Sequence, residues 1–171
     1  MKVISFYSNP PKTTYYSDHA KQWIKNIESF KLDYHIEELK SDKDYWKNTR
    51  KKPSYILDKL NQFKEDVLWI DVDLTLKTFQ DYKSYPIIAV KRPGSGFRIH
   101  SCALHFKYCD ETLNFINKWE QLCETGDLNK GDHHYLYKTK NQLNFDIKYF
   151  EKDFWDTENQ TYSPFGNSRR K

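Results

Sequence analysis

The sequence predicts an α/β domain with a mixed, mostly parallel sheet flanked by helices. Two observations support this. Apolar runs of strand length alternate along the chain with longer segments whose apolar residues recur at helical spacing. Strands that alternate with helices indicate a layered domain, because each helix can cross the sheet to a neighbouring parallel strand. The 171 residues are enough for a single compact domain with its own core.

The first elements follow from local signals. Residues 2–7 form an apolar run that ends at Asn9-Pro10-Pro11, a strong loop signal, so we expect a strand there. Apolar residues at helical spacing predict a helix over residues 19–30, with Asp18 as its cap. Residues 32–39 alternate between apolar and polar side chains, which is typical of a strand.

The middle of the chain carries the apolar core strands. Residues 45–52 are basic and aromatic, and Pro53 suits the first turn of a second helix. Residues 67–70 form an apolar run that we expect to be a buried strand. Further strands are expected over residues 86–90 and 97–106.

The last elements complete the domain. A third helix is expected over residues 110–122, and residues 145–150 are expected to form a final strand. We therefore expect one domain over residues 1–158. Residues 159–171 are interpreted as an irregular, basic tail.

Composition excludes some classes of protein. Aromatic residues make up 17% of the chain, so aromatic rings carry much of the burial. The net charge of +4 does not choose among an anionic small molecule, an anionic polymer and a membrane surface. The three cysteines fit no zinc-finger spacing, and their odd number argues against a disulfide framework. No apolar run approaches the roughly 20 residues that span a bilayer. We therefore expect a cytoplasmic protein, and its Lys/Asn/Tyr bias suggests an AT-rich viral or bacterial genome.

Asp71 and Asp73 end the apolar run over residues 67–70. Side chains alternate along a strand, so we expect both carboxylates to leave the same side of the chain. Two neighbouring carboxylates repel each other, and Mg²⁺ or Mn²⁺ would relieve that repulsion while keeping positions open for substrate phosphates. The alternative is a surface turn after a strand, because Asp-x-Asp often arises by chance.

Asp132-His133-His134 places a carboxylate and two imidazoles just after a glycine. Asp132 could act as a general base, and one imidazole could bind a metal. The alternative is that Asp132 caps a helix and the histidines are partly buried. Both interpretations remain open from the residues alone.

The segment over residues 45–52 interleaves lysine and arginine with Tyr45 and Trp46. Such a segment could clamp phosphates or stack on a base, or it could be a solvated charged surface. Residues 92–96 lack the glycine spacing of a phosphate-binding loop, so we interpret them as a mobile loop near the site. We expect Trp23 and Trp119 to lie in the core.

Several motifs occur in an order that resembles a known family. They are Ser5-Phe6-Tyr7, Lys52-Pro53-Ser54-Tyr55-Ile56, the segment 67–73, the strand 101–106 and Gly131-Asp132-His133-His134. The chain resembles the nucleotide-diphospho-sugar transferase family of GT-A glycosyltransferases from about residue 3 to residue 154.

This resemblance implies a set of roles. The donor would be a nucleotide-diphosphate sugar (UDP- or GDP-linked), bound at the carboxyl edge of the sheet. Asp132 would be catalytic, although His133 stands where the family usually has glutamine. The metal, Mn²⁺ or Mg²⁺, would be held by Asp71 and Asp73, with His134 as a further ligand, and the donor would contact Ser5, Tyr7, Arg50, Lys52, Asp71 and Ser101.

The sequence therefore favours a metal-dependent glycosyltransferase. Its acceptor could be a glycan, a protein or a small molecule, and the residues that bind it are unknown. A DNA acceptor is a less favoured alternative, which the basic segments and Arg169-Arg170-Lys171 allow. A protein that binds a nucleotide sugar without catalysis is another. Inversion or retention at the anomeric carbon is not decided.

Overall fold

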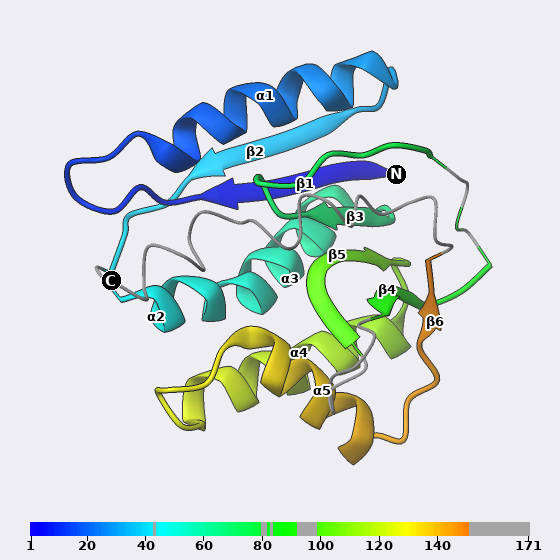
Figure 1. Cartoon of the computed structure of the whole chain (residues 1–171). Helices are drawn as coiled ribbons and strands as arrows, with labels where there is room; N and C mark the ends of the chain where they lie inside the picture. Colours follow the sequence, from blue (N-terminus) through cyan, green and yellow to red (C-terminus); the bar gives the residue numbers. More distant parts are fainter. Residues whose placement is uncertain (43, 80–81, 83, 92–98, 151–171) are drawn as a thin grey trace.

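The computed structural model describes residues 1–42, 44–79, 82, 84–91 and 99–150. Its centre is a sheet with the strand order β2-β1-β3-β5-β4-β6 (Figure 1). β1 pairs in parallel with β2 and β3, and β4 pairs in parallel with β6, whereas β5 is antiparallel to β3 and β4. The strands are β1 (Lys2–Tyr7), β2 (Tyr34–Glu38), β3 (Val67–Ile70), β4 (Ile87–Lys91), β5 (Ile99–Phe106) and β6 (Lys148–Tyr149).

Helices cover both faces of this sheet. α1 lies on one face, and α3, α4 and α5 lie on the other, with the short α2 leading into α3 (Figure 1). The predicted α/β fold class with a mixed, mostly parallel sheet is thus confirmed. The helices are α1 (Tyr15–Ser29), α2 (Tyr45–Arg50), α3 (Lys52–Phe63), α4 (Asp110–Thr125) and α5 (Asp132–Gln142).

The sheet separates two apolar clusters, because neighbouring strand residues face opposite sides. Leu68 of β3 packs with Trp23 on the α1 side. Trp69, the next residue, packs on the other side in the cluster that contains Trp119 of α4. Both Trp23 and Trp119 are almost fully buried, which confirms their predicted place in the core.

Several boundaries differ from the sequence-based expectation; the final strand, expected over residues 145–150, is only Lys148–Tyr149, and the helix α5 was not expected. The first helix begins at Tyr15 rather than His19, so Asp18 lies in its first turn and is not its cap. Its carboxylate accepts a hydrogen bond from Thr14 Oγ1 at 2.8 Å and pairs with Lys21. The basic, aromatic segment after residue 44 forms α2, where the Asp44 side chain accepts a hydrogen bond from the first turn.

The structure also bears on the cysteines and on membrane-spanning helices. The cysteines are free thiols, as their odd number suggested. Among the described residues, no helix has both the length and the apolar character that crossing a membrane requires. The loop expected over residues 92–96 and the tail expected over residues 159–171 lie outside the described residues.

Candidate functional site

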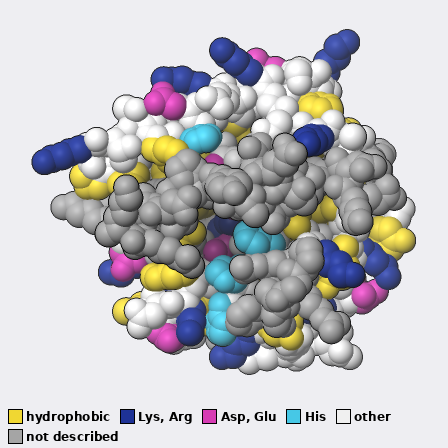
Figure 2. All heavy atoms as spheres, viewed as in Figure 1, with side chains coloured by type: hydrophobic (Ala, Val, Ile, Leu, Met, Phe, Trp, Pro, Cys, Tyr) yellow, Lys and Arg dark blue, Asp and Glu magenta, His cyan; other side chains and the backbone are white. Residues whose placement is uncertain are grey.

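The site lies at the edge of the sheet where the parallel strands β1, β2 and β3 end and the antiparallel β5 begins. The backbone N–H of Asp71, directly after β3, donates to Cys102 O at 2.7 Å. α3 and α5 both begin near this edge. Figure 2 shows a hollow on this face in which basic and acidic side chains are visible, with histidine side chains beside it. Ligands of open α/β sheets bind at such carboxyl ends of strands.

The Asp71–Asp73 pair lies on a tight turn. β3 ends at Ile70, and the N–H of Leu74 donates to the carbonyl of Asp71 at 3.0 Å. The two carboxylates therefore leave the chain from this turn and not from the strand itself. Both residues line the same pocket.

Lys52, the first residue of α3, joins two carboxylates that are distant in the sequence. Its ammonium nitrogen lies 2.9 Å from Asp71 Oδ1 and 3.0 Å from Asp132 Oδ2. It also donates to the backbone carbonyl of Ser101 at 3.0 Å. The Lys52 side chain is only 6% exposed, so this charge is compensated almost entirely inside the protein.

The same contacts determine the charge states. Burial alone would lower the pKa of Lys52, but Asp132 and Asp71 raise it well above its ordinary value, so the ammonium stays charged. Burial raises the pKa of Asp71 to about 7; Lys52 opposes this shift, and the negative charge of Asp73 adds to it. Burial acts in the same direction on Asp132, but Lys52, a hydrogen bond with Ser101 and the charge of His133 together outweigh it and leave the pKa of Asp132 below its usual range.

Asp132 is the first helical residue of α5, and Gly131 is the N-cap. The alternative in which Asp132 is the cap is therefore wrong, because its carboxylate points to Lys52. A negative charge in the first turn is still favoured by the helix dipole. The position is fixed further by Trp119 Nε1, which donates to the Asp132 carbonyl at 2.9 Å.

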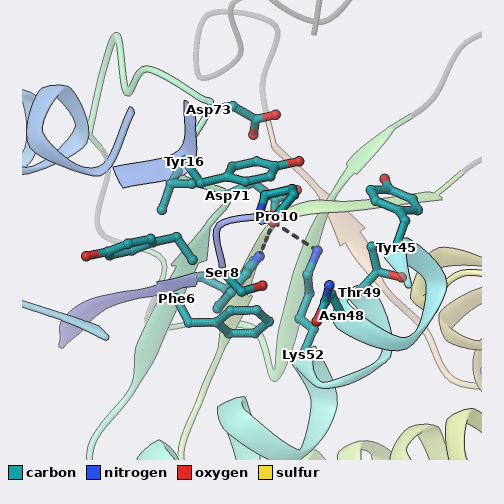
Figure 3. A pocket seen from close by; sticks show the side chains of 13 residues that line it. Phe6, Ser8, Pro10, Tyr16, Tyr45, Asn48, Thr49, Lys52, Asp71 and Asp73 are labelled. Atoms are coloured by element: carbon teal, nitrogen blue, oxygen red, sulfur yellow. Dashed lines mark hydrogen bonds and ion pairs between the residues drawn. The ribbon is translucent and has the colours of Figure 1, made fainter. Parts of the chain in front are cut away.

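Beside these charges lies a pocket of about 120 Å³ whose wall combines aromatic and polar side chains. Figure 3 shows Lys52 rising from α3 toward Asp71, while Tyr16 and Tyr45 reach in from α1 and α2. Pockets that bury a whole drug-sized ligand are about 300–1,000 Å³, so this one can enclose only part of such a molecule. The lining residues include Phe6, Tyr7, Ser8, Pro10, Tyr16, Tyr45, Asn48, Thr49, Lys52, Trp69, Asp71, Val72 and Asp73.

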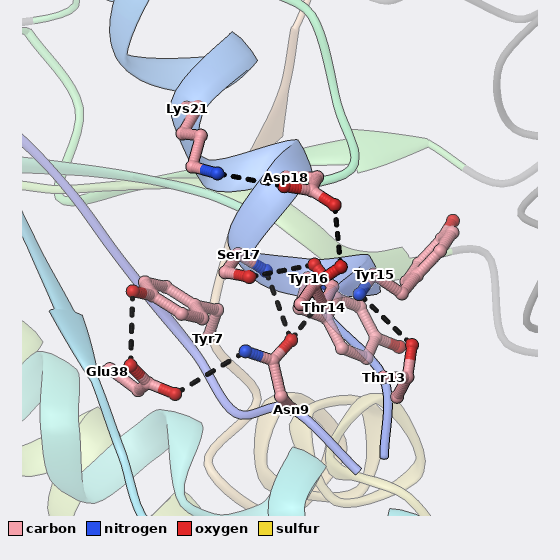
Figure 4. Close-up of polar contacts among 10 residues, drawn as sticks. All are labelled: Tyr7, Asn9, Thr13, Thr14, Tyr15, Tyr16, Ser17, Asp18, Lys21 and Glu38. Atoms are coloured by element: carbon pink, nitrogen blue, oxygen red, sulfur yellow. Dashed lines mark hydrogen bonds and ion pairs between the residues drawn. The ribbon is translucent and has the colours of Figure 1, made fainter. Parts of the chain in front are cut away.

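Asn9 positions the Tyr16 side of this pocket (Figure 4). Its side-chain oxygen accepts hydrogen bonds from the backbone N–H groups of Tyr16 and Ser17 at 3.0 and 3.1 Å. Its amide nitrogen donates to Glu38 at the end of β2 at 3.4 Å. Because the first N–H groups of a helix need acceptors, this side chain fastens α1 to the loop after β1.

The residues that the sequence predicts to bind the sugar donor do not all lie at the pocket. Tyr7 lines the pocket, and its hydroxyl donates to Glu38 at 3.4 Å. Lys52 also lines the pocket, and it donates to the carbonyl of Ser101. Ser5 is fully buried in β1, where its carbonyl accepts a hydrogen bond from the Tyr55 hydroxyl at 2.8 Å.

Arg50 and His134 lie elsewhere. Arg50 Nη1 donates to the carbonyl of Cys123 at 2.8 Å and thereby binds the last turn of α4, where carbonyl groups lack helical partners. His134 stacks edge-on against Tyr135, and it lines a separate pocket on the outer face of α5. Two residues apart on a helix point in nearly opposite directions, which is why His134 and Asp132 diverge.

The carboxylate oxygens at the site can supply some of the ligands of a hard divalent cation. Lys52 and Trp69 Nε1 both contact Asp71 Oδ1, so its other oxygen remains to bind a cation together with Asp73. Mg²⁺ is commonly bound through one or two carboxylates plus substrate phosphates, and an all-oxygen pair suits that arrangement. Among the described residues, no group of three or more His, Cys, Asp or Glu side chains is placed to hold a metal by itself.

Sequence reasoning missed part of the pocket wall. Tyr16 lines the pocket, although no sequence motif points to it. Asn48 and Thr49 lie on the pocket side of α2, which was visible only once that segment proved to be a helix.

Comparisons with known proteins bear on the fold. No protein-family model matches the sequence, and a search of curated proteins finds no match. Solved structures do match. The glycosyltransferase involved in glycosylation of the major capsid of PBCV-1 aligns over 89% of this chain and 81% of its own, with a TM-score of 0.62 and 17% identity.

Two further structures agree. Drosophila β1,4-galactosyltransferase 7, in a complex with manganese, UDP-Gal and xylobiose, aligns over 97% of this chain and 73% of its own, with a TM-score of 0.57 and 11% identity. The glycosyltransferase GlyE of Streptococcus pneumoniae TIGR4 aligns over 88% of this chain, with a TM-score of 0.54 and 14% identity. The chain spans only 45% of GlyE. The protein thus has the fold of GT-A glycosyltransferases, the nucleotide-diphospho-sugar transferase-like fold.

Proposed function

We propose that the protein is a metal-dependent glycosyltransferase that moves a sugar from a nucleotide-diphosphate sugar to an acceptor. The observation that carries this proposal is the Asp71–Asp73 pair in an aromatic pocket, at the sheet edge of a GT-A fold. The aromatic side would hold the nucleoside, and the acidic side would hold Mn²⁺ or Mg²⁺ with the diphosphate. Bound there, the cation would supply Lewis-acid stabilisation of the departing nucleoside diphosphate.

Lys52 supports this chemistry by holding the carboxylates of Asp71 and Asp132. It fixes one oxygen of Asp71, so the second oxygen is oriented before substrate arrives. Its charge also keeps Asp132 ionised. We therefore assign Lys52 as a positioning residue for both acids, and not as a direct phosphate ligand.

Asp132 lies on the α5 side of Lys52, away from the aromatic wall of the pocket. An ionised carboxylate there can accept a hydrogen bond from a hydroxyl of the acceptor or of the transferred sugar. In an inverting reaction, the same carboxylate would take the proton of the attacking hydroxyl.

The test is turnover in variants that keep the shape but remove one ligand charge. Asp71→Asn and Asp73→Asn should each lower sugar transfer from UDP- or GDP-sugars with Mn²⁺ by at least about 100-fold, as loss of a preorganised charge in a reaction site does. Asp146→Asn is the matched control, because that carboxylate is 80% exposed and pairs only with surface Lys148 in the described part of the chain.

Circular dichroism and thermal melts would show that each variant is folded. Wild-type rates in either Asp71→Asn or Asp73→Asn, at saturating donor, would refute the metal role. Calorimetric binding of a nucleotide sugar by the wild type, with no hydrolysis and no transfer, would instead favour a binding protein without catalysis.

A further inference from the structure

Three aromatic side chains form a ledge on the α5 side of the Lys52–Asp132 ion pair. We call Trp46, His100 and His133 the ring ledge; all three are partly exposed. The rings of His100 and His133 are nearly parallel, at 6° and with centroids 6.1 Å apart. They come from the start of β5 and the start of α5.

Gly131 brings the third ring to the other two. A Cβ at Gly131 would lie 2.8 Å from a ring carbon of Trp46 and 3.2 Å from His133 Nδ1. Trp46 and His133 are thus neighbours above the glycine, and a larger residue there would push them apart. Tyr45, whose ring centroid is 5.0 Å from that of Trp46, continues the ledge to the donor pocket.

The ledge borders the reactive groups without belonging to the donor pocket. Asp132 precedes His133 directly, and His133 is among the charges that lower the pKa of Asp132. Ser101, which follows His100, contacts Lys52 through its carbonyl at 3.0 Å. A molecule lying on the ledge would therefore lie close to Asp132, whose side chain is 4% exposed.

Both nucleic-acid bases and sugar rings can stack on aromatic side chains, and the charges of the site favour the sugar. Lys52 beside the ledge is buried and already paired with Asp71 and Asp132, so its charge is not offered to the phosphates of a nucleic acid. A sugar ring carries no phosphate charge. It has an apolar C–H face that packs on aromatic rings, and hydroxyl groups that can bond to imidazole and indole nitrogens at its rim.

We propose that the ring ledge is the acceptor site and that the acceptor is a carbohydrate. This rests on the proposed glycosyltransferase function, since an acceptor can react only when a sugar donor is bound next to it. The bound acceptor would lie with its C–H face on Trp46 or His133 and with a hydroxyl directed to Asp132.

The experiment separates acceptor binding from donor chemistry. Methyl glycosides of glucose, galactose, xylose, mannose and N-acetylglucosamine would be tested with UDP and Mn²⁺ present, by saturation-transfer NMR. Donor hydrolysis without acceptor and sugar transfer to the same glycosides would be measured in parallel. The variants are Trp46→Ala, Trp46→Phe and His133→Ala, with Tyr85→Ala as control because Tyr85 is an exposed tyrosine before β4.

At least one glycoside should bind and accept sugar. Trp46→Ala and His133→Ala should raise the acceptor KM at least fivefold while donor hydrolysis changes less than twofold, and Trp46→Phe should recover most of the loss. If Trp46→Ala does not fold, the acceptor KM of His133→Ala tests the proposal by itself. Unchanged acceptor KM in the folded variants, no glycoside binding, or transfer only to an oligonucleotide would overturn the proposal. Glycoside binding by a protein that binds no nucleotide sugar would contradict the proposed function but not the ledge.

Discussion

Lys52 is the residue on which the charge balance of the site depends. It is almost completely buried, yet it contacts Asp71 and Asp132 at 2.9 and 3.0 Å. Without it, two carboxylates would face each other in a region that water reaches poorly. Removing one partner of a buried ion pair is much more costly than forming the pair is beneficial.

Lys52→Met should lower the free energy of unfolding by about 3–5 kcal/mol, because it leaves uncompensated buried carboxylates. Urea denaturation would measure this. Lys25→Met, which changes an exposed lysine on α1, should stay within about 0.5 kcal/mol of wild type. Adding Asp132→Asn to Lys52→Met should recover part of the loss. Equal stability of Lys52→Met and wild type would show that the ion pairs have no net effect.

The pKa of Asp71 gives a pH dependence with a defined sign. Burial raises this pKa from 3.8 to about 7 in the folded protein. The folded state then binds the proton more tightly than the unfolded state does. The resulting stability is fully present below about pH 4 and is lost as the pH rises to about 7, with a slope of at most about 1.4 kcal/mol per pH unit.

Without divalent cations, the stability of wild type relative to Asp71→Asn should therefore fall between pH 4 and pH 7. Urea titrations of both proteins at several pH values would measure it. A difference that stays flat or rises over this interval would contradict the assignment.

For single residues, the sequence indicated which acidic residues lie at the site better than which basic residues do. Asp71 and Asp73 stand out because they end a buried apolar run, and Asp132 because it follows a glycine. The different positions of Lys52 and Arg50 could not be read in the same way. Arg50 ends α2 whereas Lys52 begins α3, and the carbonyls that bind Arg50 come from α4.

At the scale of elements, α1 and the loop before it shape the pocket together. Asn9 supplies the acceptor that the first N–H groups of α1 need, and it also contacts Glu38. The sequence indicated a loop at Asn9-Pro10-Pro11, but not that its asparagine reaches forward to the helix. Pro53, by contrast, marked the start of α3 correctly, because proline fits the first helical turn.

Asn9→Ala should lower the free energy of unfolding by about 0.5–2 kcal/mol, as loss of a helix-capping side chain does. It should also weaken UDP binding with Mn²⁺, because Tyr16 would lose its fixed position. Asn9→Asp keeps an oxygen acceptor and should lose less of both. Urea denaturation and calorimetry would check these results. An unchanged UDP affinity in Asn9→Ala would show that the Asn9 side chain does not position Tyr16 for binding.

For the whole molecule, the fold class could be predicted but the direction of every strand could not. Alternating strands and helices indicated a layered α/β sheet, and the sheet is layered as expected. The antiparallel β5 depends on pairing between β3 and a strand distant in sequence, which local patterns do not encode. That reversal is what places Ser101 and His100 at the same edge as Asp71.

Ligand binding should stabilise the folded molecule as a unit. With Mn²⁺ and UDP each in excess, the melting temperature should rise, by an amount equivalent to about 2.7 kcal/mol at a ligand concentration 100 times Kd. EDTA should reverse the rise, and Asp73→Asn should abolish most of it. A shift with UDP that is the same in EDTA would show that nucleotide binding needs no cation.

The Asn9 contact has one more consequence, for the ageing of the protein. Asparagine deamidates spontaneously when the next backbone nitrogen attacks its side-chain carbonyl and closes a succinimide ring. The next residue is Pro10, whose nitrogen carries no hydrogen, so this ring closure is blocked. The amide that joins α1 to β2 should therefore outlast asparagines followed by other residues during long storage at neutral pH.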